Sequence, residues 1–135
     1  MSKKIHFLND YSYDQILEAK NCEKGWDRIC FHDSRASKQH VMIMHMKESV
    51  TSGFHYRKSN ELICYSLRKG RLEIDIIENV GKMEEVITFN LLRQGDTLLI
   101  PEIFARNVKT NTNISATYLE IRLGPYDDTN STMWL

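Results

Sequence analysis

Apolar and polar residues alternate along several short stretches of this chain, most regularly from Arg71 to Ile77. Successive side chains of a strand point to opposite faces, so this stretch places its charged residues on one face and its apolar residues on the other. One-sided burial of this kind is typical of antiparallel sheets. Turn-forming residues follow at 79–82, before the next apolar run, and the pattern therefore predicts a β-hairpin.

Similar short segments recur along the rest of the chain, separated by Gly, Asn and Asp. The predicted strands are Arg28–Phe31, His40–Met46, Leu62–Leu67, Arg71–Ile77, Glu85–Phe89, Thr97–Ile100, Ala105–Lys109 and Ala116–Leu123. One short helix is expected from Tyr13 to Lys20, because Ser12 and Gln15 have the spacing of a capping box. No repeat or linker divides residues 1–135. We expect a single all-β domain, an antiparallel β-sandwich or small barrel with one short N-terminal helix.

Charge and composition argue against several classes of partner. The chain has 135 residues with 18 basic and 18 acidic side chains, and it has no basic stripe, so nucleic acid is not expected as a partner. No segment approaches the length of a membrane span, and no secretory signal is evident, so the cytoplasm is the expected compartment. The three cysteines form no CxxC pair and are interpreted as reduced thiols.

Two stretches have the spacing of a chemical site. The first begins at Gly53 and contains His55, Arg57 and Glu61, and the second runs from Gly95 through Pro101 to Arg106. Together they resemble the two cupin motifs, in which a Gly precedes HxH and a Glu, and a later Gly precedes PxG and a third His. In this chain Arg57 and Arg106 stand at the second and third His positions, and Ile103 stands at the Gly of PxG.

The resemblance implies an inward-facing site, and strand geometry supports it. Residues two apart on a strand share a face, so His55 and Arg57 can both enter the interior. Glu61 has the same parity if the intervening loop preserves it. A second hairpin would bring Arg106 opposite. Three imidazoles and one carboxylate would bind a divalent transition metal. Arginine has no lone pair to donate, so we expect no tightly held metal or other cofactor, and at most a weak divalent ion at His55 and Glu61.

Each candidate residue has an ordinary structural alternative. His55 and Glu61 are predicted as a catalytic acid–base pair, the alternative being two polar residues of a surface hairpin. Arg57 and Arg106 are predicted to bind a carboxylate or phosphate of the substrate, the alternative being a structural ion pair with Glu61 or Glu120.

A wider resemblance covers the chain from about Ser12 to Trp134. The expected leading helix, the segment 28–33, the region from His55 to Gly70 and the closing segment 120–128 are similar to those of WbuC-type cupins, small proteins associated with surface-polysaccharide biosynthesis. A more distant resemblance is to nucleotide-sugar ketoisomerases of the same fold, which work without a metal. These resemblances imply an anionic or sugar ligand.

The predicted strand at residues 40–46 contains histidines among apolar residues. His45 is expected in the core or wall, and the alternate Met42, Met44 and Met46 are expected to pack. The protein is expected to be a homodimer, with the same methionine face as its contact surface.

Three functions remain open from the sequence. The first is an enzyme that isomerises or epimerises a sugar or nucleotide sugar with acid–base groups. The second is a non-catalytic cupin that has lost its metal and senses an anion. The third is a metal-dependent cupin with a reduced ligand set of His55, Glu61 and His45. The fold alone does not decide among them.

Overall fold

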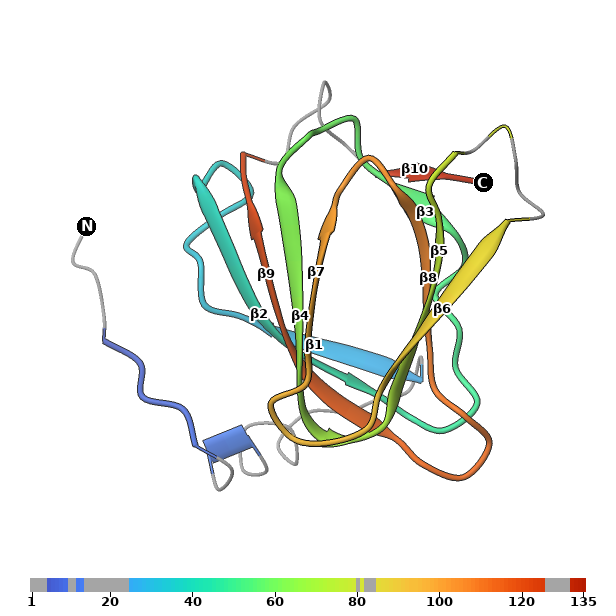
Figure 1. Ribbon diagram of the computed structural model, residues 1–135. Coiled ribbons are helices and arrows are strands. Elements are labelled where there is room, and N and C mark those ends of the chain that lie inside the picture. Colours follow the sequence, from blue (N-terminus) through green and yellow to red (C-terminus); the bar gives the residue numbers. More distant parts are fainter. Residues whose placement is uncertain (1–4, 10–11, 14–24, 80, 82–84, 126–131) are drawn as a thin grey trace.

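The architecture is a pair of antiparallel sheets that face each other (Figure 1). The computed structural model describes residues 5–9, 12–13, 25–79, 81, 85–125 and 132–135. Within them the first sheet has the strand order β1-β2-β9-β4-β7 and the second β10-β3-β8-β5-β6. The strands are β1 (Trp26–Cys30), β2 (Gln39–Met46), β3 (His55–Tyr56), β4 (Leu62–Gly70), β5 (Leu72–Ile77), β6 (Val86–Leu91), β7 (Thr97–Pro101), β8 (Ala105–Lys109), β9 (Ala116–Leu123) and β10 (Met133–Trp134). The all-β antiparallel sandwich predicted from the sequence is confirmed.

All eight predicted strands are present, with ends shifted by a few residues. The predicted hairpin is also present, because β5 pairs with β6 and Ile77 lies opposite Val86. The sequence did not reveal β3 and β10, which are too short to show a periodicity. Of the helix expected from Tyr13 to Lys20, all but Tyr13 lies outside the described residues. No described helix is long and apolar enough to span a bilayer.

The core lies between the facing sheets, where alternate residues of each strand point inward. On β4 these are Ile63, Tyr65 and Leu67, and each is fully buried. On β5 they are Leu72 and Ile74, which are equally inaccessible. Each large apolar side chain buried in this way contributes about 1.5–3 kcal/mol relative to an exposed position. The alternation that predicted these strands therefore also identifies the residues that hold the two sheets together.

The methionine face of β2 points into the molecule. Met42 is 1% exposed and Met46 is 3% exposed, and they line an internal cavity together with Met44. The expectation that this face forms the contact surface of a dimer is therefore wrong, because its side chains are covered by the second sheet. The homodimer itself stays a prediction, without this surface.

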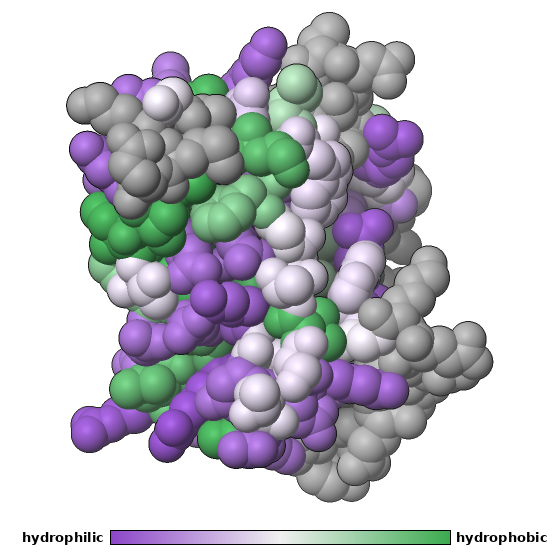
Figure 2. Space-filling model, turned by 90° about the vertical axis from the view of Figure 1, so that its right-hand side faces the viewer, coloured by the Kyte–Doolittle hydropathy of each residue, from purple (hydrophilic) through white to green (hydrophobic). Residues whose placement is uncertain are grey.

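Apolar side chains gather into a patch among polar ones on the side of the molecule that lies at the right of Figure 1 (Figure 2). On β6, Ile87 and Phe89 are 47% and 42% exposed, although their register partners Ile76 and Ile74 are buried. Partners in register share a face of the sheet. The first sheet therefore does not fully cover the inner face of β6, and Ile87 and Phe89 remain partly exposed to solvent.

Candidate functional site

A cavity of about 560 Å³ lies between β1, β2 and β9 of the first sheet and β3, β8 and β10 of the second. Cavities that bind small molecules commonly measure about 300–1,000 Å³. Among the described residues, one carboxylate, that of Glu120, lines it. Its lining arginines are Arg28, Arg35, Arg106 and Arg122. The wall is therefore rich in positive charge, although the whole chain is neutral.

Strand register explains how these charges reach one cavity. On β9, alternate residues point inward, so Glu120 and Arg122 lie on the cavity wall two positions apart. Arg122 is the register partner of His40 on β2. From the opposite sheet, His55 of β3 is the register partner of Arg106 of β8. The predicted meeting of the two motif hairpins thus occurs at these two residues.

Arg106 is buried on the cavity wall, with 1% of its surface exposed. Its Nε donates a hydrogen bond of 2.6 Å to the Tyr65 hydroxyl, and its Nη1 donates one of 3.4 Å to the Glu102 carbonyl. Both of these acceptors are uncharged, and Arg106 forms no ion pair with the described residues. The carboxylates of Glu102 and Glu120 act on Arg106 from further away. A buried charge without a contacting counter-charge is costly. An anion in the cavity would supply that contact.

His55 lies beside Arg106 and is held in one tautomer. Its Nδ1 lies 2.9 Å from the Gly53 carbonyl oxygen, which can only accept, so Nδ1 carries the proton. Its ring packs against that of Trp134, with centroids 4.8 Å apart. Burial, and next the charge of Arg106, lower the pKa of His55 to about 4. At neutral pH the imidazole is therefore uncharged, and Nε2 has a lone pair that can accept a proton or a hydrogen bond.

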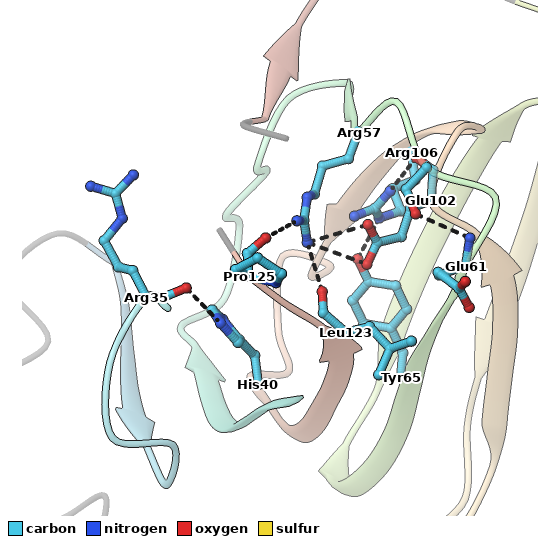
Figure 3. A network of polar contacts seen from close by, with 10 residues as sticks. Arg35, His40, Arg57, Glu61, Tyr65, Glu102, Arg106, Leu123 and Pro125 are labelled. Atoms are coloured by element: carbon cyan, nitrogen blue, oxygen red, sulfur yellow. Dashed lines mark hydrogen bonds and ion pairs between the residues drawn. The ribbon is translucent and has the colours of Figure 1, made fainter. Parts of the chain in front are cut away.

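Arg57 is fully buried but does not line the cavity. Its Nη1 lies 3.3 Å from a carboxylate oxygen of Glu102 and donates to the Leu123 carbonyl at 3.3 Å. Its Nη2 donates to the Pro125 carbonyl, also at 3.3 Å (Figure 3). These contacts correspond to the structural alternative for Arg57, with Glu102 as the partner instead of Glu61 or Glu120. Arg57 thus ties the loop at 102 to the end of β9.

Glu61 does not join His55. Its side chain is exposed and is not part of the cavity wall, and the residue lies beyond Glu102 on the side away from Arg57 (Figure 3). Its backbone carbonyl accepts a hydrogen bond from the Glu102 amide at 2.9 Å. The structure therefore does not bring together the expected acid–base pair, and the carboxylate that shares the cavity with His55 is Glu120.

These residues do not fit the metal centre of the cupin pattern. Arg57 and Arg106 cannot donate a lone pair to a metal. His45, the third ligand considered, has its Nδ1 2.9 Å from the Thr117 hydroxyl and does not line the cavity. Among the described residues, no group of three or more His, Cys, Asp or Glu side chains is placed to hold a metal ion.

Tyr65 and Arg122 were not among the site residues predicted from the sequence, and Glu120 was predicted only as a structural ion-pair partner. One signal was available for the residues on β9. In the predicted strand Ala116–Leu123, one face carries Leu119 and Ile121, and the other carries Glu120 and Arg122. The structure turns the polar face inward, where Glu120 and Arg122 lie on the cavity wall.

Comparison with solved structures identifies the fold. Lactobacillus farciminis oxalate decarboxylase shares 16% identity at a TM-score of 0.64, with 83% of this chain and 32% of that chain covered. The protein CapF shares 14% identity at a TM-score of 0.69, and the match covers 85% of this chain and 33% of that chain. The polyketide cyclase RemF from Streptomyces resistomycificus shares 10% identity at a TM-score of 0.62, and the match covers 83% of this chain and 73% of that chain. The chain thus spans about a third of the first two. No protein-family model and no curated protein sequence matches. At these identities the comparisons show the cupin fold.

Proposed function

We propose that this protein is a small-molecule-binding cupin whose cavity takes a sugar with a carboxylate or phosphate group, as the resemblance to WbuC-type cupins implies. The observation that carries the proposal is Arg106, a buried guanidinium on the cavity wall whose hydrogen-bond acceptors are both uncharged. Guanidinium groups bind carboxylates and phosphates through paired hydrogen bonds.

The distribution of charge supports an anionic ligand over a neutral one. Arg57 is neutralised by Glu102 outside the cavity. On the described cavity wall, Arg106 is buried and forms no ion pair with the described residues, and Glu120 is the one carboxylate there. Positive charges held in a partly enclosed space attract anions and raise their local concentration. Removal of a ligand's negative charge should therefore weaken binding strongly.

His55 supplies the acid–base chemistry of the proposed isomerase or epimerase reaction. With Nδ1 fixed by the Gly53 carbonyl, Nε2 is the atom that would exchange a proton with a sugar. An anion bound against Arg106 would offset the charge that lowers the pKa of His55, so the imidazole would become more basic when the ligand is bound.

A second candidate function is a non-catalytic sensor of the same anion. It is favoured by the position of Glu61, because the expected partner of His55 lies outside the cavity. Ligand turnover separates the two functions. An enzyme would convert the bound sugar to an isomer that NMR detects, whereas a sensor would return it unchanged.

Thermal unfolding with and without sugars tests the proposal. We expect glucuronate and glucose 6-phosphate to raise the Tm, and glucose to leave it unchanged. Arg106→Gln should weaken binding of both anionic sugars by about 2 kcal/mol or more, as for the loss of one partner of a charged pair. Arg106→Lys, which keeps the charge, covers the case in which the Gln variant does not fold.

Arg71→Gln is the matched control, because Arg71 is exposed and lies outside the cavity wall. It should respond to the sugars as the unmodified protein does. An equal response to glucose, or an undiminished response of the Arg106 variants to the anionic sugars, would remove the basis of the proposal.

A further inference from the structure

Arg122 approaches the same part of the cavity as Arg106, from the opposite sheet. It lies on the inner face of β9, whereas Arg106 extends from β8 to the hydroxyl of Tyr65. Tyr65 on β4 is the register partner of Glu120, which stands two positions before Arg122 on the same face. The positive charge of Arg122 also acts on His55 and Tyr65, the two residues that flank Arg106. The two guanidinium groups therefore border one common space.

Glu120 is the carboxylate beside this space. Glu120 is half-buried on the cavity wall, and its carboxylate makes no hydrogen bond or ion pair with the residues that the structure describes. A carboxylate has only acceptor positions. Next to a bound anion it repels the ligand, unless the ligand also offers it a hydrogen-bond donor.

We propose that Arg106 and Arg122 hold the anionic group of the ligand between them, and that Glu120 selects hydroxylated acids over plain acids of the same size. Each arginine presents a planar fork of donors, and a carboxylate or phosphate has enough acceptor positions for both. A hydroxyl group close to the anionic group would donate to Glu120 and turn a repulsive neighbour into a partner. The inference rests on the proposed function and names the substrate class of that site.

Calorimetric titration with two matched acids tests the inference. Glucuronate and cyclohexanecarboxylate both carry a carboxylate on a six-membered ring, but only glucuronate has hydroxyl groups. The unmodified protein should bind glucuronate more tightly. Arg122→Gln should weaken the binding of both acids about tenfold or more, because a hydrogen bond to a charged group is lost.

Glu120→Gln should reduce the difference in affinity between the two acids. It removes the repulsion between the Glu120 carboxylate and the ligand's carboxylate, so binding of cyclohexanecarboxylate should strengthen and the preference for glucuronate should become smaller. Glu78→Gln and Arg71→Gln are the matched controls, because both residues are exposed and lie outside the cavity wall. Arg122→Lys, which keeps the charge but not the fork, serves if Arg122→Gln does not fold.

Each outcome separates this inference from the proposed function. If Arg122 variants bind both acids as the unmodified protein does while Arg106 variants do not, the two-arginine arrangement is wrong and the proposed function stands. If the unmodified protein binds both acids equally, the selection by Glu120 is wrong. If it binds neither acid and no sugar phosphate, the proposed function itself fails.

Discussion

Arg57 and Arg106 occupy equivalent positions in the two sequence motifs but have different surroundings. Both are buried, as the spacing of the motifs predicted. Arg57 is neutralised by Glu102, whereas Arg106 is held by the neutral Tyr65 hydroxyl on the cavity wall. Glu102 lies within the second motif and Tyr65 lies on β4, but the spacing of the motifs does not indicate which group pairs with which arginine. The sequence therefore predicted that the arginines lie inside, but not which of them is available to a ligand.

The Arg57–Glu102 pair should contribute to stability rather than to binding. Arg57→Met would leave Glu102 buried without its cation, and loss of one member of a buried pair costs about 3–5 kcal/mol. Urea unfolding measures this loss. The double variant Arg57→Met with Glu102→Met should recover much of it, since no charge then remains unpaired. A loss below about 1 kcal/mol in the single variant would contradict the structural role.

His55 should titrate far below an ordinary histidine. Its pKa is about 4 in the folded protein, because of burial and then the charge of Arg106, against 6.5 for the free side chain. Two-dimensional NMR of the imidazole measures it directly. A midpoint near 6.5 would show that the ring is neither buried nor close to Arg106.

The same shift predicts how acid affects stability. Below pH 6.5 the unfolded chain takes up a proton that folded His55 resists until about pH 4, so stability is present at neutral pH and falls as the pH decreases through that window. Between pH 7 and pH 5, His55 should lower the free energy of unfolding by about 2 kcal/mol. In the His55→Gln variant, urea unfolding should therefore show a smaller loss of this free energy over the same pH range.

At the scale of elements, the alternation of apolar and polar residues was sufficient to locate the long strands and the β5–β6 hairpin. It failed at Glu61, because the parity argument requires an unbroken strand between Arg57 and Glu61. The chain instead bends there, and the Ser59 amide donates to the Arg57 carbonyl at 2.8 Å. The side chain of Glu61 consequently points to solvent. Parity arguments hold within strands and not across such a bend.

Two glycines at turns give a test of how closely the elements meet. Gly70 ends β4 with φ of +81°, and a Cβ there would lie 1.9 Å from the Ser115 carbonyl oxygen. Gly95 has φ of +94°, but a Cβ there would meet no atom within 4 Å. Gly95→Ala should cost about 1 kcal/mol, for the positive φ alone. Gly70→Ala should cost clearly more, because the neighbouring backbone must also move.

Urea unfolding of the two variants side by side provides the comparison. If both variants lost the same free energy of unfolding, Gly70 would not lie as close to the Ser115 carbonyl oxygen as the structure shows.

At the scale of the whole molecule, overall composition conceals the local distribution of charge. The chain has equal numbers of acidic and basic residues, yet the cavity between the sheets has four arginines and one carboxylate among its described lining residues. Arg28, Arg106 and Arg122 lie on three different strands, so only the paired sheets bring them together. The sequence motifs predicted an anion site at Arg57 and Arg106. In the fold Arg106 lies on the cavity wall with Arg28, Arg35 and Arg122, whereas Arg57 does not.

The most direct test of the central claim is a crystal structure of the protein with glucuronate. We expect the carboxylate to lie between the sheets, with oxygen atoms about 2.7–2.9 Å from guanidinium nitrogens of Arg106. We also expect Nε2 of His55 to face the sugar. A ligand bound elsewhere, or Arg106 paired with a protein carboxylate while the sugar occupies the cavity, would contradict the account.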